Sequence, residues 1–529
     1  MEISVSSKLI ASLFHILLFS ISSSASYPSP CNYEPFLNCL SIHLFDDHSH
    51  IPIYLPNTSS YNSILNSSIE NLRFSSPITP KPHLIITPLN ESHVQAAVIC
   101  SRKQKFQIRT LSGGHDYEGL SYTSNQNLPF IILDLINFQS IYVNVKDDTA
   151  WVQVGATIGQ LYYKIAEKSR IHGFPAGVCT TIGLGGHFSG GGYGLMMRKY
   201  GLSADNIVNA QIVNAKGEIL ERESMGEDLF WAIRGGSAAS FAVVLSWKIK
   251  LVQVPPTVTV FAVSKTLEQG AISLAHKWQY IAQSLPKDLT LLVRITRPNS
   301  STQAMFQSLY LGRSDQLLQI VQDRFPELGL KREDCIEMSW VRSTMYFYQL
   351  PFNGSLSILL ERNPTPRDSF KVKSDFVKEP MPESVLREIW TRLSQVGNPV
   401  ILMAPYGGRM AEIAESAIPF PHRDGNIYQI GYEVHWKKEG ENCTKLIEWM
   451  RRLYEYMTPY VSKSPREAYL NYRDLDLGRN RIDGSATYEE AKVWGVKYFK
   501  NNFDRLVEVK SEVDPDNFFT NEQSVPPLK

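Results

Sequence analysis

The residues best suited to chemistry surround a segment that is unusually rich in glycine. Seven of the twelve residues from 183 to 194 are glycine. This density weakens an ordinary helix or strand, but it lets backbone amides approach a ligand closely. A flexible linker is the alternative, yet Phe188 and Tyr193 interrupt the segment, and linkers of this kind lack buried aromatic residues. We therefore expect a ligand-binding loop.

The pattern of this loop excludes several common classes of enzyme. It is neither a Walker A loop, nor a strict GxGxxG fingerprint, nor a GxSxG nucleophile elbow. Kinases, ordinary Rossmann dehydrogenases and α/β-hydrolases are therefore disfavoured.

A second glycine turn, at residues 109–117, and a cysteine precede the loop. Ser112, Gly113 and Gly114 could bring hydroxyl and backbone donors to a pyrophosphate, with His115 beside the ligand. Cys179 comes just before the loop. A free thiol has a pKa of about 8.5, and a loop rich in donors could lower it, which favours a reactive thiolate. A buried structural cysteine is the alternative.

No metal site is expected. The six cysteines show no zinc-like spacing. A polar run could be drawn as a metal site, but it has no hydrophobic frame and is typical of a solvated loop. Its members are His43, Asp46, Asp47, His48 and His50.

The elements that must position these groups indicate an α+β chain in several parts. Strands are predicted at residues 84–86, 131–133 and 151–154, with a helix capped by Thr157. Residues 207–213 and 218–220 read as a hairpin, and a helix from Asp228 ends at Gly235. Beyond Pro255, a strand at 289–295 and amphipathic helices at 386–393 and 445–456 indicate a second domain. We predict four parts: 1–25, 26–253, 254–465 and 466–529.

Composition and the first residues bear on partners and compartment. The 529 residues carry a net charge of +1, which offers no electrostatic footprint for nucleic acid. The apolar run 9–21 is too short to span a membrane and, with the small residues after it, predicts a signal peptide over 1–25. Six glycosylation sequons agree with the secretory pathway, ending outside the cell in the apoplast, or in the vacuole. They begin at Asn57, Asn66, Asn90, Asn299, Asn353 and Asn442.

Taken together, the motifs resemble the plant berberine bridge enzyme-like family. They are residues 113–115, Cys179, 183–194, 198–202, 231–236, 471–476 and 517–519, in the family's order. The resemblance runs from about Cys39 to Pro527, and cannabinoid acid synthases and mulberry flavin-dependent oxidases and Diels–Alderases look nearest. It implies a two-part PCMH-type FAD-binding domain with an inserted α+β substrate domain built on an antiparallel sheet with helices.

The resemblance also implies how FAD is held. His115 matches the residue bonded to the 8α carbon of FAD, and Cys179 matches the residue bonded to C6, so bicovalent attachment is expected. A disulfide between Cys39 and Cys100 is implied as well. The other expected cofactor contacts are Arg109, Ser112, Gly113, Gly114, Thr180, Gly183, Gly185, Gly186, His187, Gly190, Gly191, Gly192, Asn471 and Tyr472.

For catalysis, the resemblance makes Tyr472 the base, with Tyr117 and Tyr193 as assistants. A phenol has a pKa near 10 and must be acidified or paired for this role. The lysine and the carboxylate that serve relatives are absent, because Gln429 and Gly431 stand at those positions.

Two further departures concern the flavin. Residues 237–240 replace glycines with Ser-Ala-Ala-Ser, which adds side chains beside the flavin. Ile182 stands where relatives that react with oxygen tend to carry valine, so the choice between oxidase and dehydrogenase stays open.

Three functions follow. The preferred one is oxidation of a small hydrophobic phenolic, prenylated or alkaloid substrate by hydride transfer to flavin N5, with O2 as a possible acceptor. The second is a Diels–Alderase that keeps FAD as a wall and uses proximity, in which Arg294 could hold a carbonyl or phenolate. The third is a carbohydrate oxidase, although aromatic residues 346–348 lean against sugars. A monomer is expected.

Overall fold

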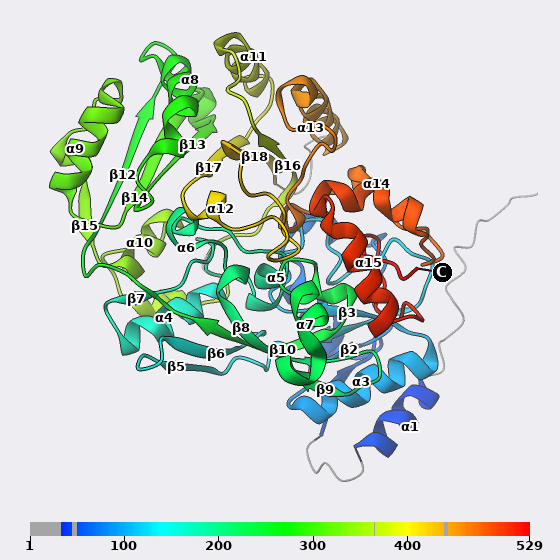
Figure 1. The fold of residues 1–529 in the computed structure, drawn as a ribbon. Coiled ribbons are helices and arrows are strands. Elements are labelled where there is room, and N and C mark those ends of the chain that lie inside the picture. Colours follow the sequence, from blue (N-terminus) through cyan, green and yellow to red (C-terminus); the bar gives the residue numbers. More distant parts are fainter. Residues whose placement is uncertain (1–32, 45–49, 364, 438–442, 529) are drawn as a thin grey trace, which may run out of the picture.

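Two halves, one above the other in Figure 1, make up the protein. The computed structural model describes residues 33–44, 50–363, 365–437 and 443–528. The lower half carries two larger sheets and the two-stranded sheet β11-β7 from the first 253 residues, and the upper half carries one seven-stranded sheet backed by helices. The C-terminal helices, red in Figure 1, return to the lower half.

The first sheet has the order β1-β2-β4-β3, and it contains the predicted runs at 84–86 and 131–133. Strands β2, β4 and β3 are parallel, and α3 connects β2 to β3. Asn90 caps α3 by accepting a hydrogen bond from the amide of His93. The disulfide Cys39–Cys100 joins α1 to α3 and confirms the implied pairing. The bounds are α1 Glu34–His43, β1 Ile53–Tyr54, α2 Ser59–Ser68, β2 Ile85–Ile86, α3 Glu91–Gln104, β3 Gln107–Leu111 and β4 Phe130–Asp134.

The second sheet is antiparallel, in the order β5-β6-β10-β8-β9. The predicted hairpin is β8–β9, and the predicted capping by Thr157 is a full capping box with Gln160. The helix predicted from Asp228 is the second part of α7, which the non-helical backbone of Gly226 separates from the first turn. The bounds are β5 Ile141–Asn144, β6 Thr149–Gln153, α4 Ile158–Lys168, β8 Ile207–Val213, β9 Ile219–Glu221, α7 Arg222–Ile233 and β10 Val243–Lys250.

The seven-stranded sheet is antiparallel, in the order β15-β12-β14-β13-β17-β18-β16. Helices α8, α9, α11 and α13 cover its outer face and enclose a second core, so its inner face is left to meet the lower half. The strand predicted at 289–295 and both predicted amphipathic helices are present. The bounds are β12 Val258–Lys265, α8 Ala271–Ile281, β13 Leu289–Thr296, β14 Gln303–Tyr310, α9 Ser314–Arg324, β15 Ile336–Met338, β16 Ser369–Val377, α11 Glu383–Leu393, β17 Pro399–Pro405, β18 Tyr428–Trp436 and α13 Cys443–Met457.

Short elements and the C-terminal segment complete the frame. Trp494 and Phe503 of the last two helices join the core of the lower half, and α15 packs on α7. The remaining bounds are β7 His172–Gly173, α5 Leu184–Ser189, α6 Met197–Tyr200, β11 Val252–Gln253, α10 Trp340–Phe347, α12 Arg409–Glu412, α14 Tyr488–Phe499 and α15 Asn502–Val513.

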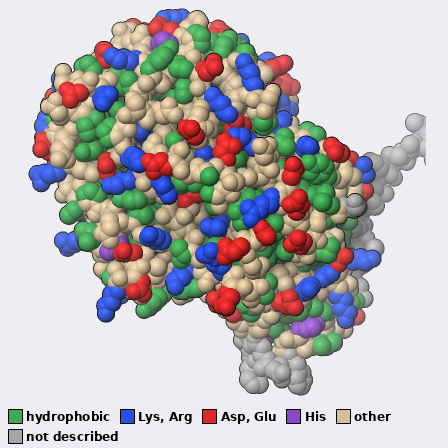
Figure 2. Space-filling view, viewed as in Figure 1, with side chains coloured by type: hydrophobic (Ala, Val, Ile, Leu, Met, Phe, Trp, Pro, Cys, Tyr) green, Lys and Arg blue, Asp and Glu red, His purple; other side chains and the backbone are tan. Residues whose placement is uncertain are grey.

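Some sequence predictions fall outside the described residues. These are the signal segment 1–25, residues 46–48 of the polar run and the sequon at Asn442. Within the described ranges, no helix combines the length and apolar character that crossing a membrane requires. Figure 2 shows basic and acidic side chains interspersed over the visible face, as a net charge of +1 would suggest.

Candidate active site

A cavity of about 350 Å³ lies between the two halves, within the range of small-molecule sites. The lower half contributes the turn after β3, the glycine-rich loop and residues 237–239. The upper half contributes β13 and β17, and the C-terminal segment contributes residues 469–473. Most of the predicted site residues line it: Arg109, Ser112, Gly113, Gly114, His115, Tyr117, Cys179, Gly183, Gly185, Gly186, His187, Gly190, Tyr193, Asn471 and Tyr472.

Four predicted site residues do not line the cavity: Thr180, Gly191, Gly192 and Arg294. Thr180 is buried, and its carbonyl accepts a hydrogen bond from the amide of Gly159 at 2.8 Å. Gly191 and Gly192 have positive φ angles of 118° and 76°, so they shape the loop. Arg294 lies on β13, beyond the lining residues Thr290 and Leu292.

The two glycine segments are pressed directly against each other. A Cβ atom on Gly113 would stand 2.3 Å from the amide nitrogen of Gly183. The Ser112 hydroxyl donates to the carbonyl of Val154 at 2.5 Å and accepts from the amide of Gly185 at 3.2 Å. Gly186 differs, because a Cβ there would meet no atom within 4 Å. The loop therefore turns a bare backbone toward open space, which is the cradle that a flat ligand requires.

One hydroxyl links His115 and Cys179. Thr181 Oγ1 lies 3.0 Å from His115 Nε2 and 3.4 Å from Cys179 Sγ. Burial lowers the pKa of His115 to about 4, so the imidazole is neutral at neutral pH and keeps a nitrogen lone pair. A neutral imidazole and a thiol near each other are chemically suited to bond to an electrophilic ring.

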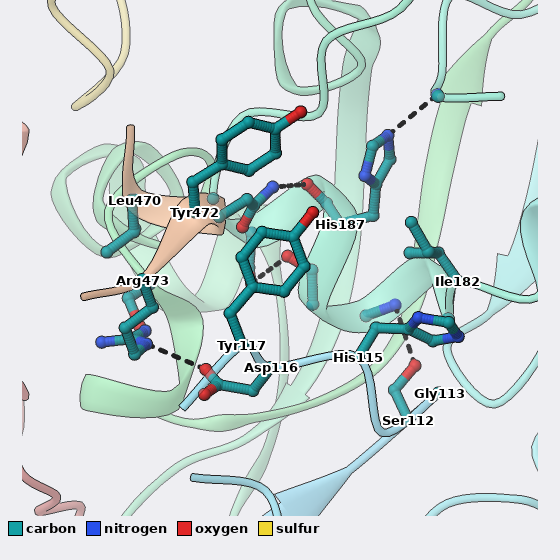
Figure 3. A pocket seen from close by; sticks show the side chains of 18 of the residues that line it. Ser112, Gly113, His115, Asp116, Tyr117, Ile182, His187, Leu470, Tyr472 and Arg473 are labelled. Atoms are coloured by element: carbon teal, nitrogen blue, oxygen red, sulfur yellow. Dashed lines mark hydrogen bonds and ion pairs between the residues drawn. The ribbon is translucent and has the colours of Figure 1, made fainter. Parts of the chain in front are cut away.

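The Asn-Tyr-Arg-Asp motif fastens the C-terminal segment to the loop. Asn471 Nδ2 donates to the carbonyl of His187 at 2.9 Å and to the hydroxyl of Tyr469 at 3.0 Å. A Cβ on Gly190 would lie only 1.9 Å from Asn471 Oδ1. Asn471 thus positions the loop. Arg473 Nε also donates to Asp116 Oδ2 at 2.9 Å (Figure 3).

Three tyrosines line the cavity side by side. The hydroxyls of Tyr193 and Tyr472 share a hydrogen bond, and the rings of Tyr117 and Tyr472 lie 5.2 Å apart. Figure 3 shows Tyr117 and Tyr472 near the labelled His115 and His187. Burial is the main cause that raises the pKa of Tyr472 and Tyr117 well above 10, and the charge of Glu433 adds to it. All three phenols are therefore neutral at physiological pH.

The sheet forms the opposite, more apolar wall. Leu292, Leu402 and Ala404 line it. Leu402 pairs with Gly431 of β18, and a Cβ on Gly431 would lie 3.3 Å from the Tyr472 ring. The missing side chain at position 431 therefore makes room for Tyr472.

Sequence reasoning missed a carboxylate beside this wall. Glu433 follows Gly431 by two residues on β18, so both side chains point to the same face. The alternation of Gln429, Gly431, Glu433 and His435 could have revealed it. Of the predicted departures near the flavin, Ile182, Ser237, Ala238 and Ala239 line the cavity.

Proteins with similar sequences agree with this geometry. The family described as "FAD binding domain" matches residues 82–222, and "Berberine and berberine like" matches residues 468–526. Tetrahydroberberine oxidase from Berberis wilsoniae is 55% identical over 534 residues, covering 99% of each chain. The chain belongs to the berberine bridge enzyme-like family. The protein is therefore an FAD-linked oxidoreductase, which confirms the predicted family, fold and cofactor class.

The names of other similar proteins point to different substrates. O-acetylstemmadenine oxidase from Catharanthus roseus is 50% identical over 528 residues, covering 98% of each chain. The solved structure of berberine bridge enzyme-like 28 from Arabidopsis thaliana has a TM-score of 0.88 and 49% identity, covering 94% of this chain and 100% of that one. Wild-type Phl p 4, a glucose dehydrogenase, has a TM-score of 0.89 and 44% identity, covering 93% and 99%.

The residues present fit FAD. The bare backbone at Gly186 leaves space for a planar ring, and His115 and Cys179 have the chemistry for covalent attachment. Arg109 is buried, but its guanidinium pairs with Glu522 at 3.0 Å and donates to Ser124 at 2.7 Å. Arg109 thus holds the C-terminal segment, and its predicted cofactor contact stays a prediction.

Proposed function

We propose that the protein is an FAD-dependent oxidase or dehydrogenase that acts on a hydrophobic, nitrogen-containing substrate. The observation that carries this is the pairing of a neutral His115 and Cys179 through Thr181, opposite an apolar wall of Leu292, Leu402 and Ala404. Bound FAD accepts a hydride. The chain's own groups bind and orient the substrate, and similarity to two alkaloid oxidases favours an amine.

Both His115 and Cys179 attach the flavin in this proposal. A neutral imidazole nitrogen is nucleophilic, and the Thr181 hydroxyl holds it in one orientation. Covalent attachment is tested by flavin fluorescence on a denaturing gel, with His115→Ala, Cys179→Ala and the double variant. Each single variant should keep fluorescence and the double variant should lose it. Cys335→Ala, a free cysteine outside the cavity, is the control. Fluorescence retained by the double variant rejects these attachment sites.

Tyr472 acts as a neutral hydrogen-bonding group rather than as an ionised base. Its raised pKa leaves the hydroxyl protonated, and Tyr193 fixes its direction. A neutral phenol pair can hold a substrate hydroxyl or methoxyl and pass a proton between its members. Tyr117 adds an aromatic face on the same side.

One experiment distinguishes amine oxidation from two other reactions. Similarity to the glucose dehydrogenase Phl p 4 favours a sugar as the second candidate, and cycloaddition without redox change is the third. The flavin-loaded protein is mixed without oxygen with tetrahydroberberine, prenylated phenols or glucose, and the visible flavin band is followed. Bleaching by the amine alone supports the proposal. Bleaching by glucose alone overturns the substrate class, and product without bleaching overturns hydride transfer.

We also propose that Ile182 limits the reaction with oxygen. It lines the cavity three residues after Cys179, so its branched side chain stands near the proposed flavin position. An isoleucine-to-valine variant of Phl p 4 is described as a glucose oxidase, whereas the wild type is a glucose dehydrogenase. A branched side chain can exclude oxygen sterically.

The protein is proposed to enter the secretory pathway and to work in the apoplast or vacuole. The signal-like segment and six sequons support this, as does the exposure of the asparagines at four of them: Asn57, Asn66, Asn299 and Asn353. Digestion of the plant-expressed protein with a glycosidase should lower its mass, and an unchanged mass overturns glycosylation.

A further inference from the structure

A carboxylate and two aromatic rings lie beside the cavity, and Tyr117 among them lines it. On the inner face of β18, Glu433 lies between Gly431, which contacts Tyr472, and His435. The rings of Tyr117 and Phe370 lie 5.3 Å apart, and those of Phe370 and His435 lie 5.6 Å apart. The rings of Tyr117, Phe370 and His435 therefore form a row beside Glu433. The register neighbours of Glu433 are Val372 and Val400.

Glu433 is mostly buried yet ionised. Its side chain is 18% exposed, and burial acts to raise its pKa. The hydrogen bond from His435 at 3.2 Å, together with the charges of His435 and Arg294, outweighs burial and lowers the pKa. Asp368, 4.0 Å from His435, adds to the rise in the pKa of that imidazole. The carboxylate is therefore a stable anion at neutral pH.

The negative charge of Glu433 affects the tyrosines that line the cavity. Glu433 raises the pKa of Tyr117, Tyr193 and Tyr472, although burial is the larger cause for each. The cavity's own arginines are already paired, Arg109 with Glu522 and Arg473 with Asp116. An incoming ammonium would therefore approach Glu433, whose carboxylate it would share with His435 and with the charge of Arg294, while Arg109 and Arg473 are neutralised.

We propose that Glu433, with the faces of Tyr117 and Phe370, forms a binding site for the positively charged nitrogen of a basic amine. A carboxylate supplies the ion pair, and aromatic faces attract ammonium groups through their electron-rich π systems. This rests on the proposed function, which it deepens by naming the group that selects amines over sugars and neutral phenols.

The site also suits the reaction. When hydride leaves the carbon beside a neutral tertiary amine, the C–H bond breaks and both its electrons pass with the hydrogen to oxidised FAD. The nitrogen then shares its lone pair with that carbon and becomes positive. An amine that arrives as an ammonium must first release its N–H proton to water. A nearby carboxylate stabilises the positive nitrogen before that release and again as charge develops on loss of hydride.

Binding is tested on the flavin-loaded protein with two probes that cannot be oxidised in this way. One is N-methyl-tetrahydroberberinium, a quaternary cation without a free lone pair, and the other is neutral 2-methoxynaphthalene. Dissociation constants come from changes in the flavin spectrum or from calorimetry. In Glu433→Gln the constant for the cation should rise at least tenfold, while that for the neutral probe stays within twofold. Glu383→Gln on α11, an exposed carboxylate, should change neither.

Glu433→Asp keeps the charge but withdraws it by one methylene, so it should weaken binding of the cation alone, by less than Glu433→Gln. If Glu433→Gln does not fold, the binding of the cation by Glu433→Asp tests the site instead. Unchanged cation binding, equal loss for both probes, or no cation binding by the wild type overturns the site.

Turnover of tetrahydroberberine by the wild type separates the two proposals. Selective cation binding without turnover supports the site and rejects amine oxidation. Turnover with a KM that Glu433→Gln leaves unchanged rejects the site and keeps amine oxidation.

Discussion

The two walls of the cavity are built in opposite ways. The lower wall consists of backbone: Gly113 and Gly183 approach so closely that neither tolerates a Cβ. The upper wall consists of side chains on regular strands, such as Leu292, Leu402 and Ala404. A backbone wall fixes one ligand shape, whereas side chains on a sheet can change without altering the fold. We infer that the lower wall holds the cofactor common to the family and the upper wall sets the substrate.

The walls also differ in electrostatics. On the lower wall, burial lowers the pKa of His115 to about 4 and of His187 to about 3, so both rings are neutral. On the upper wall, burial also acts to lower the pKa of His435, but the Glu433 hydrogen bond and the charges of Glu433 and Asp368 raise it. The lower wall therefore disfavours protonated histidine, whereas the acidic groups beside His435 favour it.

The largest expected effect comes from a side chain in the backbone wall. In Gly183→Ala the new Cβ would lie 2.2 Å from Ser112 Oγ and 2.4 Å from the amide nitrogen of Gly113. We expect a loss of stability of about 4 kcal/mol or more, with loss of bound flavin. Chemical denaturation and flavin content measure this. Gly397→Ala, where a Cβ would meet nothing within 4 Å, should match the wild type, and a stable, yellow Gly183→Ala contradicts a backbone wall.

The two histidine types should respond oppositely to pH. His187 binds protons below pH 6.5 in the unfolded chain but only near pH 3 when folded, so its burial destabilises the protein as the pH falls. Between pH 6.5 and 4 this costs about 2–3 kcal/mol. Denaturation of His187→Gln should show a smaller loss of stability over this range.

His435 supplies the opposite slope. Its raised pKa contributes stability that is present below pH 6.5 and is lost as the pH rises through the folded value. His435→Gln should therefore lose more stability in mild acid than above neutrality. Parallel pH profiles for the His187 and His435 variants would remove the electrostatic contrast between the walls.

Tyr472 reaches the same space from the C-terminal segment and should matter to turnover but not to flavin binding. In Tyr472→Phe the hydroxyl that pairs with Tyr193 is lost, and we expect kcat to fall about 10–100-fold. Steady-state kinetics and the visible spectrum measure both properties. The hydroxyl of Tyr454 has no hydrogen-bond partner among the described residues, so Tyr454→Phe is the matched control. Normal turnover in Tyr472→Phe removes its proposed role.

The smallest effect is expected when one methylene is removed from Ile182 on the lower wall. Ile182→Val should speed reoxidation of the reduced flavin by oxygen about 3–10-fold, because it opens space beside the ring. Stopped-flow mixing of reduced protein with oxygenated buffer measures this. Val178→Ala, a lining position on the other side of Cys179, tests whether any smaller side chain has the same effect. Equal rates in wild type and Ile182→Val would remove the proposed barrier.

The sequence could predict the lower wall because its signals are local. Glycine density, a histidine in a glycine turn and a cysteine before the loop lie within short segments, and the strands and hairpin at 84–220 follow simple apolar patterns. The disulfide between Cys39 and Cys100 could be predicted only from the family resemblance. Local patterns could not show that Ser112 and Asn471 hold the loop itself, because their partners Val154 and His187 are set by packing.

The upper wall escaped prediction because it depends on register. The pairing of β13, β17 and β18 puts Arg294, Leu402, Gly431 and Glu433 on one face of the sheet, and local patterns show neither this pairing nor which face α8 and α13 cover. Gln429 and Gly431 indicated missing base partners, and the carboxylate stood two residues later on the same face. Only the folded sheet shows that Glu433 acts on the tyrosines.

The most direct test of the central claim is a single turnover without oxygen. Flavin-loaded protein is mixed with tetrahydroberberine that carries either hydrogen or deuterium on the carbons beside nitrogen, and the visible flavin band is followed. We expect that the band bleaches as product forms and that deuterium slows bleaching several-fold. Product formed while the flavin band stays unchanged would contradict it.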